Sequence, residues 1–198
     1  MISSSLKPSV TKVINPVARL ALRVGLTPNM VTFIGTLGLV ISAFGLLPAG
    51  NFFQGAIAIT IFSLSDLFDG AMARLSNKGS SKWGAFLDST LDRIADAAIH
   101  IGVAIYLINN ESSLAYVVLF AMVTGFLVSY IRAKAESLGI ECSVGIAERT
   151  ERLAIALFSI GFYGLGITYS LHVGFSLLAV LGFITVIQRV IVVKRNLT

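Results

Sequence analysis

Hydrophobic residues fill six long stretches of this sequence, and short polar segments separate them. The stretches cover residues 30–48, 52–75, 84–108, 113–135, 153–169 and 171–193. About 20 consecutive apolar residues in a helix cross the roughly 30 Å of hydrocarbon in a bilayer, and a helix satisfies its own backbone hydrogen bonds there. The pattern therefore predicts an all-α integral membrane protein with six transmembrane helices.

The sequence before the first stretch differs, because apolar residues recur there at helical spacing among cations. Its apolar positions are Leu6, Val10, Val13, Ile14, Val17, Leu20 and Val24, and its basic positions are Lys7, Lys12, Arg19 and Arg23. Such a helix lies in the membrane interface, with its cations beside anionic headgroups. We expect residues 1–25 to form this amphipathic juxtamembrane helix and residues 26–198 the six-helix bundle, in a single membrane domain over residues 1–198.

Composition and charge support a membrane location. Of the 198 residues, 56% are hydrophobic and 13% charged, whereas about 25% are charged in soluble domains. With six spans, all 15 basic residues group on one side of the membrane: Lys7, Lys12, Arg19, Arg23, Arg74, Lys78, Lys82, Arg93, Arg132, Lys134, Arg149, Arg152, Arg189, Lys194 and Arg195. Basic connections stay in the cytoplasm. We expect a multi-pass protein of the cell membrane with cytoplasmic termini and no nucleic-acid partner.

Four aspartates stand where the second stretch ends and the third begins. Asp66 and Asp69 are three residues apart, and Asp88 and Asp92 are four apart, so each pair shares one face of a helix. A hairpin would bring the pairs together, and clustered carboxylates need compensating positive charge. Because oxygen ligands suit hard divalent cations, all four are predicted metal ligands. The alternative is that they pair with Arg74, Lys82 or Arg93 only to hold helices together.

Asp96 and His100 continue the row of Asp88 and Asp92 at four-residue spacing. We expect both side chains to face the interior of the bundle. His100 is interpreted as a hydrogen-bonded core residue. For Asp96 two interpretations stay open, a partner that supports the metal ligands and a buried acid.

The residues around the aspartates complete a longer motif. Its first segment is Asp66-Leu-Phe-Asp69-Gly70-Ala-Met-Ala73-Arg74, and its second, after nine residues, is Gly84-Ala-Phe-Leu-Asp88-Ser-Thr-Leu-Asp92. The motif resembles the D-x-x-D-G-x-x-A-R and G-x-x-x-D-x-x-x-D signature of the CDP-alcohol phosphotransferases. The upstream Thr27-Pro28-Asn29-Met30-Val31-Thr32 resembles the nucleotide-side segment of the same family.

The resemblance implies two divalent cations, Mg²⁺ or Mn²⁺, at the four aspartates, with Asp92 also acting as the general base. It implies transfer of the phosphatidyl group of CDP-diacylglycerol to an acceptor hydroxyl with release of CMP, and it suggests a homodimer in membrane lipid. Gly70 and Ala73 would leave room for the nucleotide, and Arg74 would neutralise phosphate. The residues expected to bind CDP-diacylglycerol are Asn29, Met30, Val31, Thr32, Asp66, Gly70, Ala73, Arg74 and Ser80.

Basic residues near the cytoplasmic ends of the last three stretches concern the acceptor. Residues 130–136 and 145–153 resemble the acceptor half of actinobacterial phosphatidylinositol phosphate synthases. On that resemblance Lys134, Arg152 and Arg195, with Arg149 as a further candidate, hold the phosphate of inositol phosphate. Glycerol 3-phosphate, the acceptor of phosphatidylglycerophosphate synthases, is the second alternative because it also needs a basic pocket.

An ion- or proton-coupled transporter is the alternative from another class of protein. It would use the same aspartates as a coupling path and would need polar residues that continue to the far side of the membrane. Residues 52–64 have no ionisable side chain. The enzyme is therefore the favoured interpretation.

Overall fold

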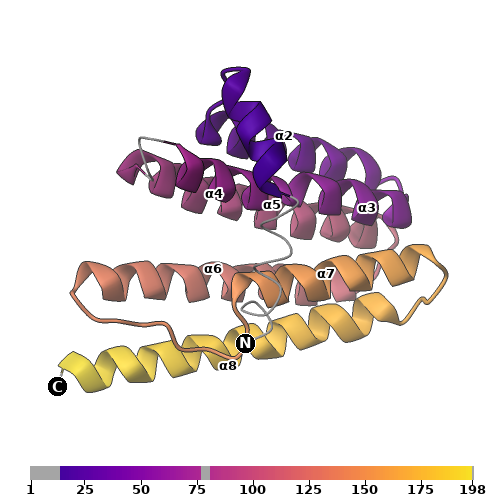
Figure 1. Cartoon of the computed structure of the whole chain (residues 1–198). Coiled ribbons are helices and arrows are strands. Elements are labelled where there is room, and N and C mark those ends of the chain that lie inside the picture. The colour runs from indigo at the N-terminus through magenta and orange to yellow at the C-terminus, as the bar shows by residue number, and fades with distance from the viewer. Residues whose placement is uncertain (1–13, 77–80, 198) are drawn as a thin grey trace. The chain divides into compact units, whose positions relative to one another are not determined.

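The computed structural model describes residues 14–76 and 81–197, and helices make up nearly all of them. A first helix over residues 14–23, here called the N-terminal helix, precedes the others. The remaining helices are α2 (Pro28–Leu46), α3 (Phe52–Ser63), α4 (Ser65–Leu75), α5 (Lys82–Asn109), α6 (Leu114–Ser137), α7 (Arg149–Gly164) and α8 (Ser170–Leu197) (Figure 1). No strand occurs in these described ranges, so the all-α prediction is confirmed.

Among the described residues, four stretches are long and apolar enough to cross a bilayer. They are Pro28–Leu46, Phe52–Leu75, which joins α3 and α4, Leu114–Ser137 and Ser170–Leu197. The 16 residues of α7 extend only about 24 Å at 1.5 Å per residue, and α5 carries acidic and basic residues through its first half. The helices are those of a membrane protein, while a count of six spans stays a prediction.

The chain forms two compact units. The first comprises the residues up to Ile41 together with Ala58–Ala95, and the second comprises Ser42–Ile57 and the residues from Asp96 onward. The aspartate motif belongs entirely to the first unit. The predicted acceptor residues belong to the second.

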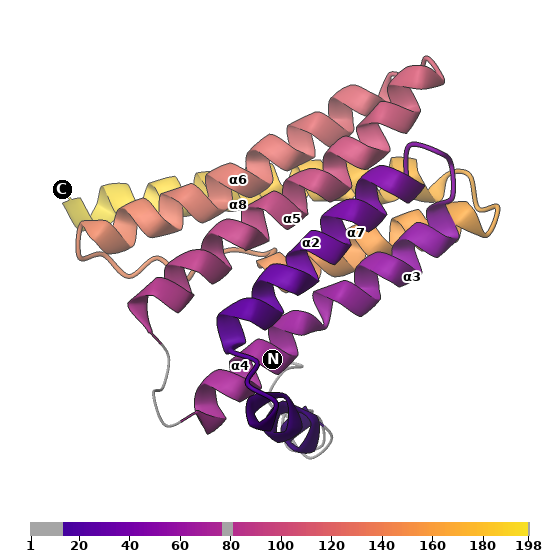
Figure 2. The ribbon, with the colours of Figure 1, turned by 90° about the horizontal axis from the view of Figure 1, so that it is seen from above.

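In the first unit the N-terminal helix packs on α4 (Figure 2). Ile14 and Ala18, one helical turn apart, are buried in a cluster with Ala71 and Met72 of α4. Other apolar residues surround this cluster: Ala21, Leu22, Leu26, Val31, Phe68 and Leu75. The faces of the N-terminal helix that stay exposed carry Val17, Arg19, Leu20 and Arg23. Residues 14–23 are therefore helical, the amphipathic character of the helix stays a prediction, and residues 1–13 lie outside the described ranges.

Glycines let α2 approach the chain around the α3–α4 junction. A Cβ added at Gly35 would overlap Oγ and Cβ of Ser65, and one at Gly38 would overlap the ring of Phe62. Small residues allow helix backbones to approach each other closely in membrane proteins. This close approach sets the distance between α2 and α4 in the first unit.

In the second unit α8 packs against both α6 and α7, and the three helices run side by side (Figure 1). Glycines again mark the contacts, since a Cβ at Gly174 would overlap Ser159 and one at Gly182 would lie 2.5 Å from Oγ1 of Thr124. The contacts hold α7, which carries two of the predicted acceptor residues, against a long helix.

Candidate active site

The motif residues of α4 lie on one face of that helix. The positions 66, 69, 70, 73 and 74 recur at the spacing of a single helical face. The opposite face, with Phe68, Ala71, Met72 and Leu75, packs in the cluster with the N-terminal helix. The packing therefore turns the motif face away from the N-terminal helix.

Three of the four aspartates come together in the first unit. Asp66 and Asp88 lie close enough to Asp69 to repel its charge, although Asp88 belongs to α5. Asp69 is buried, Asp66 is half-buried and Asp88 is exposed. In the described ranges, no three His, Cys, Asp or Glu side chains are placed so that they could hold a metal ion. The metal site at the four aspartates therefore stays a prediction.

Asp69 has a hydrogen-bond partner on α2. The hydroxyl of Thr32 lies 2.5 Å from Oδ2 of Asp69 and 3.0 Å from the carbonyl oxygen of Pro28. Both Thr32 and Asp69 are buried, at 6% and 8% exposure. This contact, between residues 37 positions apart, links the two segments expected to serve metal and nucleotide.

Asp92 lies one turn beyond Asp88 on α5. Its Oδ2 is 3.3 Å from Nη1 of Arg93, and the same nitrogen donates to the carbonyl oxygen of Ser89 at 3.0 Å. The Asp92 side chain is 15% exposed. A half-buried carboxylate can accept a proton, so the position of Asp92 is compatible with the base predicted from the motif.

The segment expected to bind the nucleotide forms the start of α2. The Thr27 hydroxyl accepts from the backbone N–H of Met30 at 3.3 Å, and Pro28 takes the first helical position, where a proline is favoured. Met30 is exposed, whereas Val31 packs in the apolar cluster around α4. Thr27 and Pro28 therefore also form the N-terminal cap of α2, and both residue types are typical of the start of a helix.

Asn29 places the start of α2 next to the start of α5. A Cβ at Gly84 would lie 3.1 Å from Oδ1 of Asn29 and 3.1 Å from Oγ of Ser81. The Gly84 N–H donates to the Ser81 hydroxyl at 2.9 Å, so Ser81 caps α5. Ser80, predicted to contact the nucleotide, lies outside the described residues.

Gly70, Ala73 and Arg74 complete the motif face of α4. Gly70 and Ala73 are half-buried, and Arg74 is exposed in the last turn. Nη1 of Arg74 lies 3.6 Å from the point that a Cβ of Gly70 would occupy. The guanidinium therefore folds back over the glycine, on the face that carries Asp66 and Asp69.

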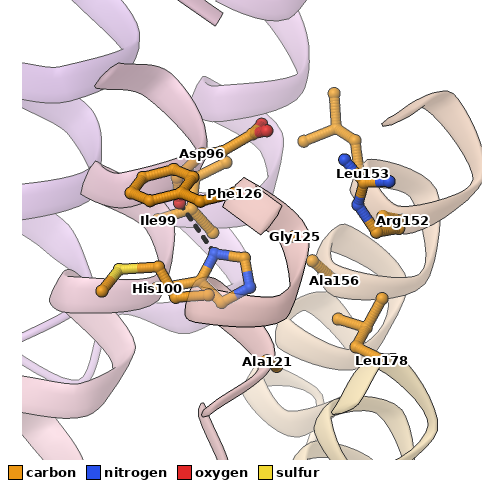
Figure 3. A pocket seen from close by; sticks show the side chains of 11 residues that line it. Asp96, Ile99, His100, Ala121, Gly125, Phe126, Arg152, Leu153, Ala156 and Leu178 are labelled. Atoms are coloured by element: carbon orange, nitrogen blue, oxygen red, sulfur yellow. Dashed lines mark hydrogen bonds between the residues drawn. The ribbon is translucent and has the colours of Figure 1, made fainter. Parts of the chain in front are cut away.

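The second unit contains a cavity between α5 and α7. Figure 3 shows Asp96 and His100 of α5 on one side and Arg152 of α7 on the other. Nδ1 of His100 lies 2.7 Å from the carbonyl oxygen of Asp96, and because a carbonyl only accepts, this nitrogen carries the proton. The ring also packs edge-on against Phe175. His100 is thus the hydrogen-bonded interior residue predicted from its position.

Two of the predicted acceptor residues converge beside this cavity. Arg152 lines it and donates to the carbonyl oxygen of Ala147 at 2.9 Å. Nε of Arg149 lies 3.5 Å from Oδ1 of Asp96. Lys134 and Arg195 are instead exposed near the ends of α6 and α8, so the structure groups the arginines of α7 with Asp96 and leaves the other two in solvent-accessible positions.

Arg189 is a structural residue of this region that the sequence interpretation left unassigned. It is 3% exposed, and it donates to the carbonyl oxygens of Val144 at 2.9 Å and Val128 at 2.5 Å. It therefore ties α8 to α6 and to the segment that leads into α7. The sequence indicates this residue only as a single cation within an apolar stretch. A cation at the cytoplasmic end of a helix gives the same pattern, so the buried role of Arg189 could not be distinguished.

Comparisons with known proteins agree with the motif. The family model for CDP-alcohol phosphatidyltransferase matches residues 25–192. A phosphatidylinositol phosphate synthase of Streptomyces avermitilis is 42% identical over 99% of this chain and 84% of that protein. One of Cutibacterium acnes is 43% identical over 93% of each chain.

Solved structures show the same fold. The phosphatidylinositol phosphate synthase of Mycobacterium tuberculosis with CDP-DAG bound has a TM-score of 0.87 and 40% identity, covering 92% of this chain and 94% of that one. The same enzyme in complex with manganese and citrate has a TM-score of 0.86 and 41% identity, covering 91% and 88%. The resemblance seen in the aspartate motif is confirmed. The chain belongs to the CDP-alcohol phosphatidyltransferase family.

Proposed function

We propose that this chain transfers the phosphatidyl group of CDP-diacylglycerol to a hydroxyl of inositol phosphate, forming phosphatidylinositol phosphate and releasing CMP. The observation that carries the proposal is the complete aspartate motif on α4 and α5, with Asp88 of α5 near enough to Asp69 of α4 to act on its charge, in a chain that belongs to the family. The acceptor follows from the relatives, because synthases of that name match nearly the whole chain at about 40% identity.

The residue types present fit hard divalent cations. Asp66 and Asp88 lie near enough to Asp69 to interact with its charge, and Mg²⁺ and Mn²⁺ prefer carboxylate oxygens as ligands. The related enzyme of M. tuberculosis has been solved with manganese. We infer that Asp66, Asp69, Asp88 and Asp92 hold two Mg²⁺ or Mn²⁺ ions, which would polarise the diphosphate and stabilise the leaving CMP.

The remaining chemistry belongs to side chains of the protein. Asp92 takes the proton from the acceptor hydroxyl, whose oxygen forms a bond to the lipid-side phosphorus while the bond from that phosphorus to CMP breaks. Arg93, 3.3 Å away, restricts the orientation of Asp92. Arg74 supplies a positive charge for the diphosphate on the face of α4 where Gly70 and Ala73 leave space for the nucleotide.

The start of α2 borders the same place. Asn29 reaches the start of α5 at Gly84, so its amide is positioned for the nucleotide. Met30 and Val31 would contribute through their backbone or through apolar contact with the lipid substrate. Ser80 would supply a hydroxyl from the connection between α4 and α5.

The acceptor phosphate would bind the cations of the second unit. Arg152 lines a cavity, Arg149 lies beside Asp96, and both guanidinium groups can form paired hydrogen bonds with a phosphate. Lys134 and Arg195 would add charge from α6 and α8. Asp96 then orients Arg149, which is a role different from the two interpretations that its position in the sequence left open.

The wider architecture follows from the same proposal. We place six helical spans across the cell membrane, with the N-terminal helix in the interface, and treat residues 1–198 as one membrane domain. The termini and active site would face the cytoplasm, because all the basic residues group there. A homodimer is proposed from the family resemblance alone.

A competition among acceptors tests the proposal. Purified protein would receive CDP-diacylglycerol and Mn²⁺ with inositol 3-phosphate, inositol, glycerol 3-phosphate or serine in parallel, and CMP release would be measured. Release only with inositol 3-phosphate is expected. Release only with glycerol 3-phosphate would favour a phosphatidylglycerophosphate synthase, and the absence of release with every acceptor would contradict the enzymatic proposal.

A further inference from the structure

We infer that Thr32 is a positioning residue, whose hydroxyl holds the carboxylate of Asp69 in the orientation that a metal ion requires. The inference rests on the metal site of the proposed function. The sequence grouped Thr32 with the residues that contact CDP-diacylglycerol, whereas in the structure its hydroxyl bonds to an aspartate and to a backbone carbonyl.

The hydrogen-bond geometry defines where the hydroxyl proton goes. Thr32 has one proton and two acceptors in range, Oδ2 of Asp69 at 2.5 Å and the carbonyl oxygen of Pro28 at 3.0 Å. A hydrogen bond from a hydroxyl to an ionised carboxylate is shorter and about twice as strong as one between neutral groups. The proton therefore lies toward Asp69, and the short distance agrees with a charge-assisted bond.

The position of Thr32 makes this donor rigid. A β-branched side chain has few χ1 rotamers in a helix, and Thr32 is in the second turn of α2, after the Thr27 cap and Pro28. It is also buried, so water cannot easily replace the bond. Asp69 consequently has a fixed donor on one side, and its remaining lone pairs face in a defined direction.

The surrounding helix contact supports the same interpretation. Gly35 is three residues after Thr32, and Ser65 is four residues before Asp69, so both pairs share helix faces. The missing side chain at Gly35 lets Ser65 come into contact with α2. The close approach of the two helices thus serves to bring the hydroxyl within reach of Asp69.

A purely structural role is the competing explanation, in which the bond only clamps α2 to α4. The two explanations differ in what removal of the hydroxyl does to metal affinity. Hydrogen-bond partners of metal ligands typically change affinity by about 10–100-fold when they are mutated. A clamp would change the thermal midpoint and leave metal affinity as it was.

The test uses the full-length protein and Mn²⁺ alone, without substrate. Thr32→Val keeps the shape and removes the hydroxyl, and Thr32→Ser restores it. Thr36→Val is the matched control, because Thr36 is a buried threonine one turn further along α2. Binding would be followed by the electron paramagnetic resonance signal of free Mn²⁺, and folding by thermal unfolding.

We expect the Kd for Mn²⁺ to rise about 10–100-fold in Thr32→Val and to stay within about 3-fold of wild type in Thr32→Ser and Thr36→Val. An unchanged Kd in Thr32→Val, with binding lost in Asp69→Asn, would overturn the inference and leave the metal site standing. If Thr32→Val does not fold, Thr32→Ala is used instead, and the same rise in the Kd for Mn²⁺ is expected. Wild-type protein that binds no Mn²⁺ would overturn the metal site itself, and with it the inference, while CMP release would still test the transferase.

Discussion

Replacement of Gly35 by alanine should separate α2 from α4 and weaken the active site. The added Cβ would overlap both Oγ and Cβ of Ser65 and would lie 3.2 Å from the carbonyl oxygen of Phe62. Rotation of the serine side chain can move Oγ but not Cβ, because Cβ is fixed to the backbone. The helices must therefore move apart.

The size of the effect follows from three opposing contributions. Overpacking of this kind costs about 1–3 kcal/mol, and loss of the Thr32–Asp69 hydrogen bond costs about 1.5–3 kcal/mol because one partner is charged. Alanine regains about 1 kcal/mol of helix propensity over glycine. We expect a net loss of about 1.5–5 kcal/mol in the free energy of unfolding, together with at least a 10-fold loss in the rate of CMP release.

Gly45→Ala in the same helix is the matched control, because a Cβ there has no atom within 4 Å. It should leave activity unchanged and stabilise the protein by up to about 1 kcal/mol. Both variants would be compared with wild type by thermal unfolding and by CMP release in one detergent. A Gly35→Ala protein as stable and as active as Gly45→Ala would refute the proposed helix contact.

Three further changes test the assigned roles. Asp92→Asn should abolish CMP release while CDP-diacylglycerol still binds, which equilibrium binding of labelled lipid would show, and normal turnover would exclude Asp92 as the base. Removal of divalent ions with EDTA should stop CMP release, and added Mn²⁺ should restore it; activity that persists in excess EDTA would contradict the metal assignment. Arg152→Gln should raise the KM for inositol phosphate by at least 10-fold with little change in the KM for CDP-diacylglycerol, whereas equal changes in both would show that Arg152 does not select the acceptor.

The sequence predicted the helical fold well, because hydrophobic stretches of membrane length have few other structures available to them. It did not reveal the interruption at Leu64, where the expected span over 52–75 divides into α3 and α4. Hydropathy is averaged over a window of about 19 residues, so a break at one residue does not change it visibly. The Ser63 hydroxyl bonds to the carbonyl oxygen of Thr60, and bonds of this kind often bend helices.

The surroundings of the basic residues could not be predicted from the sequence. Arg189 and Arg195 both look like cations at the end of the last apolar stretch, yet Arg189 is buried and Arg195 is exposed. The difference arises from the segment before α7, which presents the carbonyl oxygen of Val144 to Arg189. A non-helical segment has no periodicity, so its path cannot be read from a pattern.

In the N-terminal helix, the amphipathic pattern alone does not determine whether protein or lipid covers the apolar side chains. Helical periodicity predicted an apolar face, but lipid and protein can cover such a face equally well. In the structure Ala18 is fully buried against α4, while Leu20 is 61% exposed. Ile14 and Ala18 therefore meet protein, while Val17 and Leu20 stay available for lipid.

This division has a consequence for α4. Because the N-terminal helix covers the face with Ala71 and Met72, the motif residues Asp66, Gly70 and Arg74 lie on the face of α4 that this helix leaves uncovered. The fixed positions of the family motif recur at three- and four-residue spacing, which already describes one helical face. The N-terminal helix supplies the physical reason, since a helix packed on one side can carry chemistry only on the other.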